Sequence, residues 1–160
     1  MSRGSARSAI RRRIETIVAG HKMPSRDSVS ATDVKDIRVF EQFPSLANDG
    51  TPRIPGAIVA LHDDSEDDDV ETYLVPVTVA IATYAIDTES GFADPENLVE
   101  AIKIDLKSKP YCESFKLKGP WQIGVMRDAK GVVFQSTLSF NVELLATQAT
   151  TGPNGETMGV

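Results

Sequence analysis

Cysteine and histidine are scarce in this chain. Of its 160 residues, only Cys112 is a cysteine, and only His21 and His62 are histidines. A lone cysteine cannot form an intrachain disulfide, which favours a reducing compartment. Structural zinc sites need several Cys or His ligands at close spacing, and these three residues do not provide it. The sequence also lacks the motifs of serine hydrolases, zinc peptidases, P-loop proteins and dinucleotide-binding enzymes. We therefore predict no catalytic residues, no metal site and no cofactor.

Long hydrophobic runs are also missing. No apolar run reaches the ~18 residues of a membrane-spanning helix, and the N-terminal region lacks the apolar core of a signal peptide, so we expect no membrane partner. Hydrophobic residues make up 41% of the chain and charged residues 25%, which is ordinary for a globular protein. This length suits one domain, which we predict over residues 1–147. Residues 148–160 are polar and glycine-rich, and we expect them to form a flexible C-terminal tail.

The charge of the chain is unevenly distributed. The net charge is −6, which argues against a nucleic-acid-binding protein. Residues 1–26 nevertheless carry seven basic side chains against one acidic side chain, a balance of +6, so the remainder carries −12. The basic residues could form a solvated helix face, or they could contact the acidic part of a neighbouring copy. On the second interpretation, Arg7, Arg11 and Arg12 lie at a subunit interface.

Residues 132–145 show a long alternation of apolar and polar residues. Apolar residues occupy every second position, with only Ser136 interrupting them: Val132, Phe134, Leu138, Phe140, Val142 and Leu144. Side chains of a strand point alternately to opposite faces, so this pattern predicts one long strand with a core face and a wet face. At about 3.3 Å per residue it would span roughly 45 Å, which is more than a small domain needs. We expect part of it to project toward a partner.

The other predicted elements surround this strand. Residues 70–84 alternate in the same way, although Pro76 lacks an N–H and therefore indicates an edge or a bulge. Amphipathic helices are predicted over residues 5–19, with Ser5 as cap, and over residues 94–107. Short strands are predicted over residues 33–43, 56–62 and 121–127, the last joined to the long strand by a turn, and residues 111–120 are expected to be irregular. The prediction is an α+β fold with a mainly antiparallel four- to five-stranded sheet and helices packed on one face.

An acidic run precedes the second long strand. It holds six carboxylates in seven residues, Asp63, Asp64, Glu66, Asp67, Asp68 and Asp69. A calcium loop of the EF-hand type would need a glycine after Asp67, and none is present. The run could therefore be a solvated, self-repelling loop or a functional electrostatic surface.

These pieces resemble, in order and spacing, the tail terminator or tail completion proteins of long-tailed bacteriophages. The matching pieces are the first helix, the strand led by Pro55, the acidic run, the strand ending near Asp87, the helix capped by Asp94, and Gly131-Val132 followed by Leu138, Phe140 and Val142. The resemblance covers residues 5–146. Residues 33–55 form a longer segment than is usual in that family, and the residues after Thr147 have no counterpart.

The resemblance implies a structural virion protein at the head–tail junction, assembled in the host cytoplasm. Six copies would form a ring that caps the tail tube protein and meets a head-completion or connector protein. DNA would pass through the lumen without sequence-specific binding. The acidic side chains from Asp63 to Asp69 would line that lumen, and the predicted interface residues are Arg7, Arg11, Arg12, Val70, Pro76, Asn141 and Glu143. The alternatives are another neck or tube component, a small carboxylate-based enzyme, or a ligand-binding domain.

Overall fold

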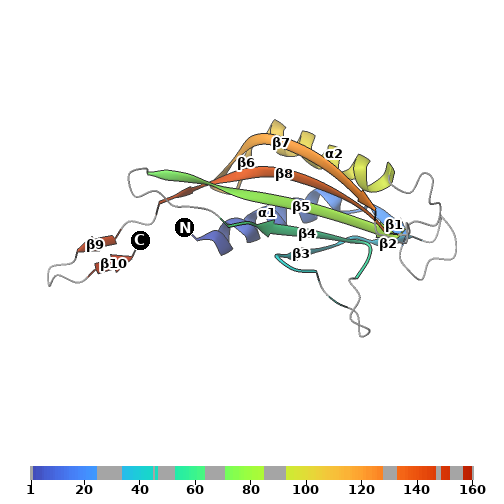
Figure 1. The fold of residues 1–160 in the computed structure, drawn as a ribbon, viewed down its shortest axis with the longest axis horizontal. Coiled ribbons are helices and arrows are strands. Elements are labelled where there is room, and N and C mark those ends of the chain that lie inside the picture. Colours follow the sequence, from blue (N-terminus) through green and yellow to red (C-terminus); the bar gives the residue numbers. More distant parts are fainter. Residues whose placement is uncertain are drawn as a thin grey trace.

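The computed structural model describes residues 2–24, 34–44, 46, 53–63, 71–84, 93–127, 133–146, 149–151 and 157–159. Two helices and a large sheet make up most of the described chain (Figure 1). The helices are α1 (Arg3–Val18) and α2 (Ala93–Ser108). The strands are β1 (Lys22–Pro24), β2 (Val34–Asp36), β3 (Arg38–Glu41), β4 (Gly56–Leu61), β5 (Thr72–Tyr84), β6 (Tyr111–Cys112), β7 (Phe115–Arg127), β8 (Val133–Leu145), β9 (Ala149–Thr151) and β10 (Thr157–Gly159).

The main sheet has six strands in the order β3-β4-β5-β8-β7-β6. Only the β3–β4 pair is parallel, and the other pairs are antiparallel. The prediction of a four- to five-stranded sheet was therefore wrong, although the fold is mixed α+β. The residues from Tyr111 to Pro120 were expected to be irregular, yet they form β6 and the first half of β7. Strand β7 continues past Gly119-Pro120, because a shift of register at this point accommodates the extra residues.

Strands β5 and β8 confirm the alternating pattern. Each has 13 residues, and they pair along their whole length, from Tyr84 with Val133 to Thr72 with Leu145. The buried side chains are Val75, Val77, Val79, Ile81 and Thr83 on β5, and Phe134, Ser136, Leu138, Phe140, Val142 and Leu144 on β8. Ser136 interrupts the apolar pattern but keeps its place on the core face.

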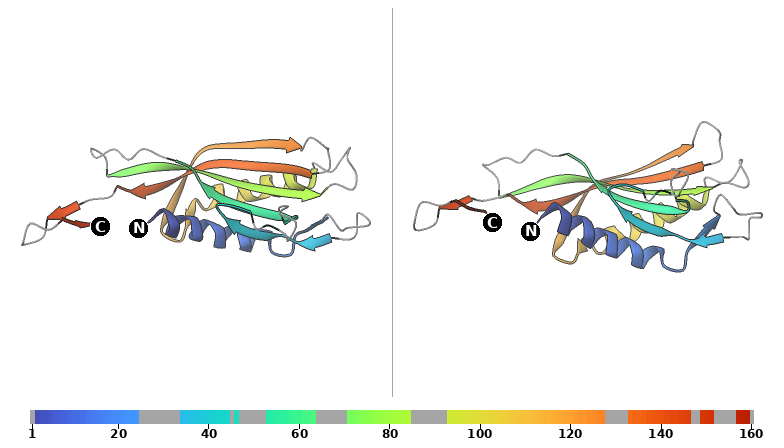
Figure 2. Two further views of the ribbon diagram at one scale, coloured as in Figure 1. Left: turned by 60° about the horizontal axis from the view of Figure 1, so that its bottom comes forward. Right: turned by 90° about the horizontal axis from the view of Figure 1, so that it is seen from below.

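Both helices cover the same face of the sheet, which leaves the opposite face without a helix (Figure 2). Helix α1 begins earlier than predicted, because Ser2 rather than Ser5 is the cap: the Ser5 N–H donates to Ser2 Oγ at 3.1 Å. The helices bury two apolar stripes against the core face, consisting of Ala6, Ala9, Ile10, Ile14 and Val18 on α1, and Leu98, Val99, Ile102 and Leu106 on α2. The buried positions recur at helical spacing, so the amphipathic pattern decides which side of each helix faces the sheet.

A bulge divides β7 into two halves. Lys118 pairs with Asn141 and Gln122 pairs with Ser139, so three residues of β7 lie opposite the single residue Phe140. Asn141 Nδ2 donates to the Gly119 carbonyl at 3.0 Å, and the Trp121 ring stacks on Phe140 with a centroid separation of 5.0 Å. Extra residues bend a strand and increase its twist. The bulge therefore changes the direction of β7 at its middle.

Two small antiparallel pairs lie outside the main sheet. Strands β1 and β2 form one, and β9 and β10 form the other. The second pair lies within residues 148–160, which were expected to form a flexible tail. Figure 1 shows this C-terminal hairpin beyond the end of β8 and away from the helices and the sheet.

Candidate functional site

The face of the main sheet that neither described helix covers is poor in charged side chains at its centre. Four neighbouring strands contribute small or uncharged side chains to its centre; we call these residues the open sheet face: Ile58, Ala60, Thr78, Ala80, Ala82, Gly124, Thr137 and Ser139. The register places them side by side, since Ala80 lies between Ile58 and Thr137, and Thr137 pairs with Gly124. Charged side chains lie at the ends, with the Lys118–Glu143 ion pair at one end and Arg53 near the other.

A shallow apolar hollow lies at the Arg53 end of the open sheet face. It has a volume of ≈ 180 Å³ and is lined by Phe40, Pro44, Arg53, Ile54, Gly56, Ile58, Ala80, Ala82, Val133 and Gln135. Small-molecule pockets usually enclose about 300–1,000 Å³, so this hollow is small for such a ligand. Phe43, next to Pro44 in the chain, is 76% exposed. The hollow and this exposed ring extend the apolar character of the face to its edge.

The arginines predicted at an interface already have acidic partners within the chain. Arg7 Nε and Arg11 Nε donate to the two carboxylate oxygens of Glu41 at 3.2 and 2.9 Å, and Arg11 also bonds to Glu15. Burial alone would raise the pKa of Glu41, but the hydrogen bonds from Ser8, Arg7 and Arg11 outweigh it and leave that pKa lowered. This cluster fastens α1 to β3. It lies within one chain, so a head-to-tail use of these arginines stays a prediction.

Arg12 and Arg13 tie α1 to the other side of the fold. Arg12 forms an ion pair with Glu113 at 2.6 Å. Arg13 donates to Asp105 Oδ1 at 2.7 Å and to the carbonyl of Tyr111 at 2.6 Å, in a polar hollow of ≈ 430 Å³. Sequence reasoning missed the role of Arg13, because its partners lie more than 90 residues away and leave no local signal. The carboxylates here are neutralised by arginine, so neither hollow combines an apolar lining with free converging carboxylates.

The predicted strand-end residues fall into two groups. Pro76 is exposed, just beyond the last β4–β5 pair, and its carbonyl accepts from the His62 N–H at 2.9 Å. Its missing N–H thus lies where β5 has lost one neighbour, as the edge prediction required. Asn141 and Glu143 instead contact residues of their own chain. Asn141 donates to the Gly119 carbonyl, and Glu143 forms an ion pair with Lys118. Pro76 is the better candidate for an external contact.

Most of the acidic run lies outside the described residues. Asp63 is described and is exposed. Asp64, Glu66, Asp67, Asp68, Asp69 and Val70 lie outside the described residues. Within the described part of the chain, no group of three or more His, Cys, Asp or Glu side chains could hold a metal ion.

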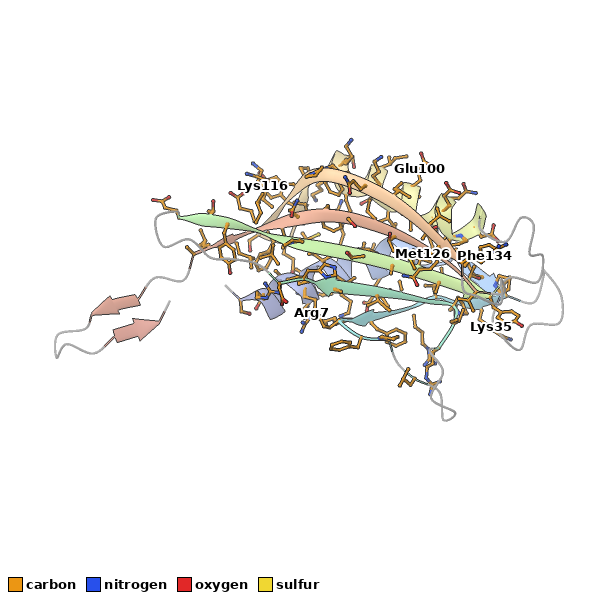
Figure 3. All side chains as sticks on the ribbon, in the orientation of Figure 1. Arg7, Lys35, Glu100, Lys116, Met126 and Phe134 are labelled. Atoms are coloured by element: carbon orange, nitrogen blue, oxygen red, sulfur yellow. The ribbon has the colours of Figure 1, made fainter. Side chains whose placement is uncertain are left out.

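The outer edge of β7 is a second candidate surface, which the sequence did not predict. Strand β6 pairs only with Phe115 and Lys116 at the start of β7. Along the half of β7 after the bulge, no described strand lies on the outer side. Val125 and Met126 on this half are 46% and 61% exposed. Figure 3 shows Met126 and Phe134 near one end of the sheet and Lys116 toward the other end.

No known protein family matches the chain, and none of the curated proteins matches it either. No helix in the described part of the chain is long and apolar enough to cross a membrane. Function must therefore be inferred from the open sheet face and the outer edge of β7.

Proposed function

We propose that this chain is a structural virion protein, a tail terminator whose copies form a six-membered ring. The ring caps the tail tube, joins it to a head-completion or connector protein, and lets DNA pass through its lumen. The observation that carries the proposal is the open sheet face. The resemblance in the order of elements supplies the family, and the open sheet face supplies a surface for assembly.

The composition of the open sheet face favours contact with another protein. A sheet with one solvated face usually carries polar and charged side chains on that face. Here Ala60, Thr78, Ala80 and Thr137 meet at its centre, and their short side chains permit close approach of a second surface. Depletion of charge is typical of the buried core of protein interfaces. The face therefore fits a neighbouring copy or the tail tube better than open water.

The acidic run suits a channel for DNA. Six carboxylates so close together repel one another, and water and counter-ions must screen them within about 8–10 Å. A water-filled lumen provides that screening, whereas a packed interface does not. An acidic wall also repels phosphates, so the duplex would slide rather than bind. In this proposal the run from Asp63 to Asp69 faces the lumen.

The mass of the purified chain in solution tests the ring. Light scattering should give about six times the 17.3 kDa of one chain, and electron micrographs should show rings. Ala80→Glu places a charge at the centre of the open sheet face and should convert the ring to smaller species with an unchanged circular dichroism spectrum. Ala101→Glu, at an exposed position of α2, is the matched control and should assemble normally. A wild-type chain that is monomeric at all concentrations would contradict the ring.

The lumen assignment has its own test. Replacing four of the acidic residues by Lys should leave the ring assembled but slow the ejection of DNA from particles that contain it, because lysines bind phosphates. Normal ejection would place the acidic run on the outside of the ring as a solubilising turn.

A further inference from the structure

We propose that the C-terminal hairpin, β9–β10, of one copy adds to the outer edge of β7 in a second copy. The inference deepens the proposed function, since it names a contact between neighbouring copies. It rests on that function only for the closure of the contacts into a ring. Both elements have backbone groups that lack a neighbouring strand within the described part of the chain.

The half of β7 after the bulge has no described strand on its outer side. The last outward backbone bond that the structure places on β7 runs from the Leu117 N–H to the Pro110 carbonyl, at 2.9 Å. Beyond it, Gln122 to Arg127 pair with β8 on one side only, within the described part of the fold. Exposed edges normally carry charges, prolines or a covering element. After the bulge, β7 carries only Arg127, at its last position.

The C-terminal hairpin is a sheet of only two strands, with no third described strand beside it. Its two strands pair through only three residue pairs, from Ala149 with Gly159 to Thr151 with Thr157. Figures 1 and 2 show it apart from the sheet and from both helices. An isolated two-stranded hairpin is marginally stable in water, because it has no third element to pack on. Addition to another sheet would supply a third strand and satisfy its outer backbone groups.

The hairpin cannot reach the middle of the exposed β7 edge in its own chain. Val125 pairs with Ser136, nine residues before Leu145, so it lies about 30 Å along the sheet from the point where the chain leaves β8. The six residues from Leu145 to Thr151 span at most about 20 Å when fully extended. Gln122, at the start of this edge, pairs with Ser139, so β9 of the same chain could at most reach the start of the edge, and a hairpin that pairs along the edge must come from a second copy.

The chemistry of the two surfaces is compatible. Strand addition uses main-chain hydrogen bonds, so the added segment needs β-forming residues and no like charge. Glu156 is the only charged side chain in residues 147–160, and the only charged side chain on β7 after the bulge is Arg127. The contact joins two different surfaces, a hairpin and an edge, and each copy keeps one of each free. Such a heterologous contact propagates and closes into a ring when the rotation permits.

Cross-linking between two full-length variants tests the contact. One variant carries Gln122→Cys on the exposed edge, and the other carries Thr150→Cys on β9. A short bismaleimide should give a product of twice the chain mass only when the two are mixed. Cys112 is buried and should not react. The matched control replaces Gln122→Cys by Glu100→Cys on α2, and it should give at least tenfold less product.

A second measurement follows association by sedimentation velocity, with the full chain throughout. Met126→Lys puts a charge on the edge, and Thr150→Pro removes an N–H from β9; each should weaken association about tenfold or more. Ile104→Lys is the control, because Ile104 is an equally exposed apolar residue, at 64%, on α2. It should leave association unchanged.

The outcomes separate this contact from the ring. Equal cross-linking of the edge and control variants, or rings that persist in both Met126→Lys and Thr150→Pro, would overturn the hairpin contact and leave the ring proposal standing. Cross-linking through the edge in a species that never exceeds a dimer would support the contact and overturn the ring.

Discussion

Phe140 offers the sharpest test of the core. It lies at the middle of β8, opposite the bulge of β7, and is 2% exposed. Its ring stacks on Trp121, and Val77 pairs with it from β5. Truncation to alanine removes the ring from a site that several elements enclose, so the neighbours cannot close the space. Phe140→Ala should lower the free energy of unfolding by about 3–5 kcal/mol.

The aromatic pair accounts for part of that loss. Stacked rings contribute about 0.5–1.5 kcal/mol beyond the burial of their area. A double-mutant cycle with Trp121→Leu and Phe140→Leu should therefore give a coupling energy in that range. Urea unfolding followed by circular dichroism suits all variants, because Trp121 is the chain's sole tryptophan and fluorescence would be lost with it. Protein concentration must be held constant, since association stabilises the folded state.

Phe43→Ala is the control for this experiment. Phe43 is 76% exposed, and its truncation should change the free energy of unfolding by no more than about 0.5 kcal/mol. A loss below about 1 kcal/mol for Phe140→Ala would mean that Phe140 faces solvent. The register of β8 would then be displaced by one residue, and every assignment to the open sheet face would be wrong.

Three further predictions concern single polar groups. Because the pKa of Glu41 is lowered, its contribution to stability is present above its ordinary value of 4.5 and is lost as the pH falls below it; Glu41→Gln should flatten the acid side of a stability–pH curve. Burial raises the pKa of the Cys112 thiol to about 11 from 9.0, so a disulfide reagent at pH 8 should react about a hundredfold more slowly than with the urea-unfolded chain, and equal rates would show that Cys112 is accessible. The buried Ser136 hydroxyl has no hydrogen-bond partner in the described part of the structure. Ser136→Ala should therefore leave the free energy of unfolding unchanged or raise it by about 0.5–2 kcal/mol. A clear decrease would show that the hydroxyl has a hydrogen-bond partner.

The sequence predicted those parts of the fold that local periodicity determines. Strands β5 and β8 alternate over 13 residues, and on β8 this pattern identified the residues of the core face. The position of helix α2 was also predicted, because Asp94-Pro95-Glu96 favours a helix start and the apolar residues that follow recur at helical spacing. In both cases the signal lies in neighbouring residues, and tertiary contacts only reinforce it.

The missed features depend on contacts between distant residues. Phe115 and Leu117 alternate with two lysines, but this run is only four residues long before Gly119-Pro120, and residues 111–120 were expected to be irregular. The excess of positive charge at the N-terminus suggested an external partner. In the structure, Arg11 instead meets Glu41, 30 residues away, and Arg13 meets Asp105, 92 residues away. An asymmetry of charge along the sequence therefore does not imply an asymmetry on the surface.

Adjacent positions of one strand separate folding from assembly. Val79 is completely buried on the core face of β5, and Ala80 lies on the open sheet face of the same strand. Val79→Ala should lower the free energy of unfolding by about 2 kcal/mol, because two methyl groups leave a closed core, while any ring formed by the folded fraction keeps its size. Ala80→Glu should leave the free energy of unfolding nearly unchanged but reduce the size of the assembly. A carboxylate exposed to water costs little, whereas a carboxylate buried in a contact with another chain is destabilising. If both substitutions lowered stability equally, the open sheet face would be covered within the chain, and the open sheet face could not be an assembly surface.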